Sequence, residues 1–149
     1  MRLTLYTDYS LRVLIYLAQN PDKVVTISEL ADFYRISRNH LVKVVHELGL
    51  NGYVHTTRGK HGGIRLARPP DQIVIGEVVR KTEPDFDLLE CLNPVGDHCV
   101  ITNVCKLKSV LTEARDQFLG ELDSRTLADL TINSAKFSPA FKSIPILHG

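Results

Sequence analysis

The three cysteines of this 149-residue chain lie close together. Cys91, Cys99 and Cys105 follow the pattern C-x7-C-x5-C, and the chain has no other cysteine. Thiolates bind soft metal ions and react with oxidants, so three of them in one short segment indicate a metal or redox site. An odd number of cysteines, in a chain without an evident export signal, argues against a disulfide framework.

The spacing of the cysteines favours one kind of metal site over another. Structural zinc sites usually contain close C-x2–4-C pairs, which are absent here. Iron–sulfur clusters accept looser spacings because the inorganic core spreads the ligand positions. Cys105 is expected in the first turn of a long helix, where the helix dipole favours thiolate. A zinc site and three bare thiols, either buried or redox-sensing, remain alternatives.

Three thiolates leave one coordination position to be filled by another residue. The candidates near the cysteines or at the chain start are Asp8, Glu90, Asp97 and His98. A single oxygen or nitrogen ligand binds iron less firmly than thiolate does, and so leaves one corner of a cluster open to small molecules. Such a corner suits a chemical sensor, whereas an electron carrier generally uses four thiolates.

The elements upstream of the cysteines begin with two expected helices. The first runs from Thr7 to Asn20 and has a largely apolar surface typical of a core helix. The second is announced by the capping box Thr26-Ile-Ser-Glu29. Val25 and Leu30 stand at the positions of a hydrophobic staple, which fixes the angle at which the chain enters the helix.

A third helix is expected from Arg38 to about Leu50, with Ser37 as its cap. Its apolar residues recur at i, i+3, i+4 and i+7 and form one buried stripe: Leu41, Val44, Val45 and Leu48. The opposite side keeps Arg38, Asn39, Lys43 and His46. Two helices joined by so short a turn form a helix-turn-helix, whose second helix reads DNA. The predicted DNA-contacting residues of this part are Ser37, Arg38, Asn39, His40 and Lys43.

A basic hairpin follows the third helix. Strand-like runs at 53–57 and 64–67 flank the glycine-rich loop Arg58-Gly-Lys-His-Gly-Gly63. This arrangement predicts a wing (53–67), in which Arg58 and Lys60 contact phosphates or a minor groove. An ordinary hairpin with a solvated tip is the alternative.

The predicted fold class is mostly α, with a small β-hairpin wing and a long dimerisation helix. Residues 1–83 are expected to form a winged helix-turn-helix domain that ends with a short helix at 75–83. Residues 84–101 form a cysteine loop, and 102–130 a long helix and a shorter one. Apolar residues of the long helix recur at spacings of three, four and seven, which indicates a seam for a second copy: Val104, Leu107, Leu111, Phe118 and Leu122. The tail, 131–149, has no periodicity.

Charge is sorted along the chain. Residues 1–68 contain ten Lys and Arg against five Asp and Glu, whereas residues 69–149 contain eight against twelve. A basic front half suits contact with a polyanion such as DNA. The longest apolar runs are too short to span a bilayer, and we expect a cytoplasmic protein. We also expect no enzyme, because no nucleophile elbow, phosphate loop or Cys–His–acid arrangement is evident.

Several motifs together resemble one family, the IscR-like winged-helix iron–sulfur regulators. They are the opening Met-Arg-Leu-Thr, Thr-Asp-Tyr at 7–9, Ile-Ser-x-Asn-His-Leu at 36–41 and Arg-Gly-x-x-Gly-Gly at 58–63. The segments 99–108 and 122–130 look most similar to the nitric-oxide-sensing repressors of that family. The resemblance covers about residues 1–130 and several independent motifs in order.

The resemblance implies a homodimer that binds a double-stranded DNA operator. It implies one iron–sulfur cluster per subunit, 2Fe–2S or 4Fe–4S, held by Cys91, Cys99 and Cys105. Asp8 matches an acidic position that reaches the partner subunit's cluster as a fourth ligand; as an alternative, Asp8 caps its own helix. Nitrosylation or loss of the cluster would release DNA and derepress genes for nitric-oxide detoxification. An IscR-like regulator of cluster assembly and a zinc- or thiol-based winged-helix regulator are the alternatives.

Overall fold

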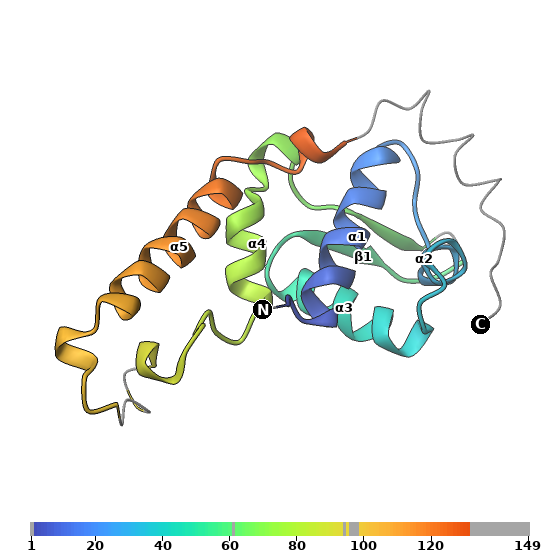
Figure 1. The fold of residues 1–149 in the computed structure, drawn as a ribbon. Coiled ribbons are helices and arrows are strands. Elements are labelled where there is room, and N and C mark those ends of the chain that lie inside the picture. The colour runs from blue at the N-terminus through green and yellow to red at the C-terminus, as the bar shows by residue number, and fades with distance from the viewer. Residues whose placement is uncertain (1, 61, 94, 96–98, 132–149) are drawn as a thin grey trace, which may run out of the picture.

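The computed structural model describes residues 2–60, 62–93, 95 and 99–131. In this part the chain forms five α-helices and one antiparallel hairpin, as the predicted fold class requires (Figure 1). The helices are α1 (Leu5–Gln19), α2 (Ile27–Tyr34), α3 (Arg38–Leu50), α4 (Ile75–Thr82) and α5 (Lys106–Asp123). The strands are β1 (Val54–Thr57) and β2 (Gly63–Leu66). No helix in the described ranges is both long and apolar enough to cross a membrane.

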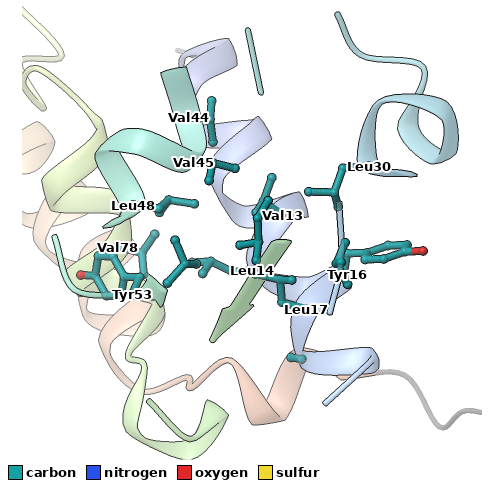
Figure 2. Close-up of a cluster of buried hydrophobic side chains, with 14 of the residues drawn as sticks. Val13, Leu14, Tyr16, Leu17, Leu30, Val44, Val45, Leu48, Tyr53 and Val78 are labelled. Atoms are coloured by element: carbon teal, nitrogen blue, oxygen red, sulfur yellow. The ribbon is translucent and has the colours of Figure 1, made fainter. Parts of the chain in front are cut away.

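The core lies where α1 meets the helix-turn-helix and the hairpin. α1 packs against α3, α4 and β2, and α2 packs against α3. Figure 2 shows the side chains of α1 pointing at those of α2 and α3, with Tyr53 and Val78 closing the far end. Val13, Leu14 and Leu48 have no accessible surface. Full burial of a side chain of this size contributes roughly 1.5–3 kcal/mol, so this cluster holds α3 firmly on the domain.

The starts of the three N-terminal helices follow the expected chemistry only in part. α1 begins at Leu5, two residues earlier than predicted. Its N-cap is Thr4, whose hydroxyl accepts a hydrogen bond from the amide of Thr7 (3.2 Å). Thr26 accepts the amide of Glu29 (3.1 Å), as the capping box requires. Ser37 stands at the N-cap of α3 but makes no side-chain cap bond, so the prediction that its hydroxyl caps the helix was wrong.

The carboxylate of Glu29 has two strong partners outside the capping box. It accepts hydrogen bonds from the hydroxyl of Tyr16 (2.6 Å) and from the ammonium of Lys23 (2.5 Å). Burial acts to raise the pKa of Glu29, but these bonds outweigh it and hold the pKa below its usual value. Glu29 therefore stays ionised and ties α2 to α1.

The hairpin is extended by a third segment of chain. β1 and β2 pair in the register Val54↔Leu66 to Thr57↔Gly63, one residue shorter at each outer end than predicted. Val25 pairs with Ile64 on the other side of β2, through N–O distances of 3.1 and 2.7 Å. The connection between α1 and α2 therefore braces the base of the wing.

The long helix α5 starts later than predicted and differs from the others in its packing. A 3-10 turn at Thr102–Val104 precedes it, Cys105 is its N-cap, and none of its residues is buried. It lies alongside α4 and extends away from the helix-turn-helix (Figure 1). After α5 the chain returns to the core of the domain. There Leu127 is fully buried and donates its amide to the carbonyl of Ile73 (2.8 Å). The expected short helix is reduced to a 3-10 turn at Ala128–Leu130.

One ion pair joins α5 to α4. The guanidinium of Arg80 binds the carboxylate of Asp123 through both oxygens, and the Nη2–Oδ2 distance is 2.7 Å. Gly76 makes room for this pair, since a Cβ there would lie 1.9 Å from the Asp123 carboxylate. Both partners of the pair are well exposed. The direction in which α5 leaves the domain is thus set at its C-terminal end.

Two N-cap residues, one with a side-chain cap bond and one without, provide a paired test of helix stability. Thr26→Ala should lower the free energy of unfolding by about 1 kcal/mol, because it removes a cap bond. Ser37→Ala should change it by less than about 0.5 kcal/mol, because no cap bond is lost at this exposed site. Urea unfolding followed by circular dichroism measures both. Equal losses in the two variants would contradict the assignment of the caps.

Candidate functional site

The outer side of α3 is open to solvent. Four consecutive residues at its start are exposed: Ser37, Arg38, Asn39 and His40. Lys43 and His46, one and two turns further along the helix, are exposed as well. The opposite side is buried through Leu41, Val44, Val45 and Leu48. No acidic residue occupies the first turn. Side chains of this kind can contact base edges and phosphates, the amide of Asn39 by pairing with adenine and the guanidinium of Arg38 with guanine.

The start of α3 also touches α1. The ring of His40 faces the ring of Tyr9, with 6.2 Å between the centroids. The turn between α2 and α3 passes through Arg35 in a left-handed conformation (φ 55°). A displacement of α1 would therefore reach a predicted DNA-contacting residue directly. The sequence contained no signal for this contact.

The tip of the wing holds the two other predicted DNA-contacting residues. Arg58 and Lys60 are exposed, and within the described residues neither pairs with a carboxylate. Gly59 between them has a positive φ of 106°, which a residue with a side chain rarely adopts. His61, part of the predicted wing, lies outside the described residues. The tip thus offers two unpaired cations close together.

The cysteine segment lies beyond the N-terminal end of α5 (Figure 1). Cys91 is half-buried in a 3-10 turn, Glu90–Leu92, that contacts α5. Cys99 is exposed, and Cys105 is half-buried at the N-cap of α5, one residue before the helix and not in its first turn as predicted. The backbone at Cys105 is extended (ψ 109°). None of the three cysteines forms a disulfide.

The described residues do not bring a complete set of metal ligands together. No group of three or more His, Cys, Asp or Glu side chains among them is arranged to hold a metal ion. The donor set nevertheless fits an iron–sulfur cluster in kind, since it consists of three thiols outside any disulfide. The thiol of Cys105 makes no cap bond to the first amides of α5. It is therefore available as a ligand.

Most of the exposed large apolar side chains belong to the same stretch of sequence as the cysteines. Ten large apolar residues are exposed in the described part of the chain, and seven of them lie between residues 89 and 110: Leu89, Val95, Val100, Ile101, Val104, Leu107 and Val110. Val100 is fully exposed and Val104 is 80% exposed. Large exposed apolar patches mark interaction sites. We call residues 89–110 the thiol segment.

Asp8, the predicted fourth ligand, has a partner in its own helix. Arg12 binds its carboxylate through Nε and Nη2, each at 2.9 Å. Asp8 does not cap α1, so the capping alternative was wrong. The backbone carbonyl of Arg12 in turn accepts a hydrogen bond from the hydroxyl of Tyr34 (3.0 Å). Burial raises the pKa of Tyr34 to about 12. The i,i+4 spacing of Asp8 and Arg12 could have predicted this pair.

The remaining candidates for a fourth ligand are less well described. Glu90 is exposed in the turn that contains Cys91. Asp97 and His98 lie outside the described residues. The tail from residue 132 onward does so too. Of the four candidates the structure thus describes two carboxylates, Asp8 in α1 and Glu90 within the thiol segment.

Hydrogen bonds link the start of α1 to the end of α4, from which the chain continues to the thiol segment. The carboxylate of Glu83 accepts the amide (2.8 Å) and the hydroxyl (3.0 Å) of Thr4. One turn deeper, the buried hydroxyl of Thr7 donates to Thr82 (2.9 Å). Sequence reasoning missed this connection because its partners are far apart in the chain. It holds the start of α1 against the end of α4, upstream of the segment that carries the cysteines.

Comparison with known proteins gives one family. A family model described as Rrf2, iron-dependent transcriptional regulator, matches residues 3–133. The chain is 54% identical over 134 residues to the HTH-type transcriptional regulator NsrR of Bacillus licheniformis, covering 89% of this chain and 94% of the relative. It is also 54% identical to NsrR of Bacillus subtilis, covering 89% and 92%.

Solved structures of similar proteins have the same fold. CymR, described as the global cysteine regulator of B. subtilis, matches with a TM-score of 0.70 and 26% identity, over 87% of this chain and 95% of that one. IscR of T. potens matches with a TM-score of 0.69 and 26% identity, over 87% and 85%. This chain therefore shares its winged-helix architecture with DNA-binding regulators whose structures are solved.

Proposed function

Because the chain belongs to the Rrf2 family and is a DNA-binding transcriptional regulator, we propose that it is a homodimeric repressor that releases its operator in response to nitric oxide. The observation that carries the proposal is the thiol segment. Three cysteines outside any disulfide and seven exposed large apolar side chains fall in this one segment, which leads from the DNA-reading domain into α5, a helix with no buried residue. A sensor needs a reactive site at this junction.

DNA contact is assigned to α3 and the wing. Ser37, Arg38, Asn39, His40 and Lys43 would enter a major groove, and Arg58 and Lys60 the flanking backbone or minor groove. Their exposure and the absence of acidic residues at the start of α3 support this assignment. Two copies would read two half-sites one helical turn apart.

The second copy is expected to cover α5. Leu107 and Val110 are 56% and 59% exposed, although both are large apolar residues. Leu111, Phe118 and Leu122 continue the same seam and are half-buried. A helix of 18 residues with none buried is stable when a partner covers its apolar side.

The cofactor is assigned to the thiol segment. Cys91, Cys99 and Cys105 would each supply a thiolate, and Asp8 of the partner subunit a carboxylate. An iron–sulfur cluster supplies iron that binds nitric oxide. For Asp8 to bind iron, its pair with Arg12 must open, which is inexpensive because both side chains are substantially exposed and such a pair contributes about 0–1 kcal/mol.

The chain's own contacts indicate how the signal could reach DNA. Glu83 ends α4 six residues before the thiol segment, and it holds Thr4 at the start of α1, so movement of the segment would be passed to α1 through Glu83. Tyr9 of α1 touches His40 of α3. Two positions of α1 would thus present α3 differently to DNA. The nitric-oxide signal itself is supported by the resemblance of segments 99–108 and 122–130 and by the NsrR relatives.

A titration tests this function. Protein purified without oxygen should shift an operator duplex in a gel, and nitric oxide added up to about one equivalent of cluster should abolish the shift. The expected loss is roughly 5- to 150-fold in affinity, the usual range of coupling between two sites. Operator binding that is unchanged by nitric oxide but depends on the iron supply would instead support a regulator of cluster assembly. The similarity to IscR favours this alternative.

A further inference from the structure

A hollow of about 340 Å³ lies at the back of the winged domain, away from the thiol segment. The end of α1 and the turn after it form one wall, and the chain that leaves β2 forms the other. Three basic side chains line it, Lys23, Arg65 and Arg68, and none of its lining residues is acidic. Neither the proposed DNA contacts nor the cysteines use these residues.

Two of the three cations lack a carboxylate. Lys23 is bound to Glu29, but within the described chain neither Arg65 nor Arg68 forms an ion pair. Arg65 is exposed on β2 and stands opposite His55 in the hairpin. The hollow therefore holds two guanidinium groups that no carboxylate of the described residues pairs with.

Arg68 carries the most informative atom of the hollow. Its guanidinium lies over the ring of Tyr53, with 4.9 Å from Cζ to the ring centroid. Within the described residues its Nε is buried and makes no hydrogen bond, and the same is true of the buried hydroxyl of Tyr53. Leaving a buried donor unpaired costs about 1–3 kcal/mol, and more for a charged group. Such atoms in native proteins are normally satisfied by ordered water or by an ion.

The helix dipole does not account for this arrangement. Cations are favourable near the C-terminal end of a helix such as α1. However, two of the last four carbonyls of α1 are already bonded, since Asn20 donates its amide to the carbonyl of Leu17 (3.1 Å) and its side-chain amide to the carbonyl of Tyr16 (2.8 Å). The dipole would explain nearby positive charge, but it supplies no acceptor for the Nε of Arg68.

We propose that this hollow binds a phosphate-class oxyanion, with Arg65 and Arg68 as the donors and Lys23 at the rim. The planar guanidinium donates two parallel hydrogen bonds to such an oxyanion. The volume is at the low end for small-molecule sites, which suits a phosphate with a small substituent. The phosphate belongs either to a free small molecule or to the DNA backbone. The inference does not depend on the cluster or on nitric oxide.

Inorganic phosphate is the probe for the first source. Phosphate titrated at constant ionic strength, with chloride as the balancing anion, should raise the melting temperature of the full chain saturably. Arg68→Gln should remove this rise, and so should Arg65→Gln, whose exposed site tolerates the change. Arg125, an exposed cation that follows α5, pairs with Glu121 and does not line the hollow, so Arg125→Gln is the control and should respond as the unaltered chain does.

Operator binding is the probe for the second source. If the phosphate belongs to DNA, Arg68→Gln should weaken operator binding and reduce the slope of log K against log salt by about 0.9. Arg125→Gln should leave the slope unchanged. A phosphate response lost in Arg68→Gln, or a reduced slope, supports the site and identifies its source. An unaltered chain without a phosphate response, together with an unchanged slope in both arginine variants, would overturn it.

Discussion

Replacing any one of the three cysteines by Ser should remove iron from the protein and abolish its response to nitric oxide. Serine keeps the shape of the side chain but is a poor ligand for an iron–sulfur cluster. Operator affinity should then fall roughly 5- to 150-fold, to the level of the nitric-oxide-treated protein. Because the three thiols serve one site, the triple variant should be no worse than each single variant. Iron analysis and gel shift measure both effects.

The fold should survive these substitutions. None of the three cysteines belongs to the buried core, and Cys99 is exposed. The urea midpoint of the apoprotein should therefore change little. Asn103→Ser, an exposed position between Cys99 and Cys105, is the matched control and should keep iron and response. Wild-type iron content in all three cysteine variants would be incompatible with the ligand assignment.

Leu107→Glu should convert the protein to a monomer and weaken operator binding by roughly 100-fold or more. The side chain lies on the seam of α5, and two-fold symmetry would place two carboxylates in one apolar interface. Losing the second half-site also loses the gain from bivalent binding, which is commonly 10²- to 10⁴-fold. Light scattering coupled to size exclusion gives the mass, and gel shift gives the affinity.

The matched control adds the same charge elsewhere on the helix. Ser109 follows Leu107 by two positions, which places it about 200° around α5, and it is exposed. Ser109→Glu should remain dimeric and bind the operator. Iron content is measured in both variants, because Leu107 lies close to Cys105 in sequence. A dimeric Leu107→Glu with normal operator binding would show that α5 is not the interface.

Elements with local signals were predictable from the sequence. The stripe of Leu41, Val44, Val45 and Leu48 identified α3 and its buried side, because a buried stripe of this period admits one helix register, and the expected bounds, Arg38 to about Leu50, agree with the structure. The wing was predictable from glycines and alternating strands. The start of α1 was not, since Thr4 and Thr7 are equally good caps and the difference depends on the distant Glu83.

Features that depend on distant partners could not be predicted. The return of Leu127 into the core and the Arg80–Asp123 pair have no local pattern. The start of α5 was placed too early because Thr102–Val104, expected to be part of the helix, forms a 3-10 turn before it. The positions of the cysteines around a metal depend on a group that the chain alone does not contain, so spacing indicated the chemistry but not the geometry.

The content of iron, acid-labile sulfide and zinc in protein purified without oxygen tests the central claim most directly. The account predicts iron and sulfide in equal amounts, at one cluster per subunit, with negligible zinc. It also predicts that both are absent from the Cys99→Ser variant purified in parallel. One zinc per subunit without sulfide, or neither metal in a protein that still binds its operator, would contradict the claim that the thiol segment holds an iron–sulfur cluster.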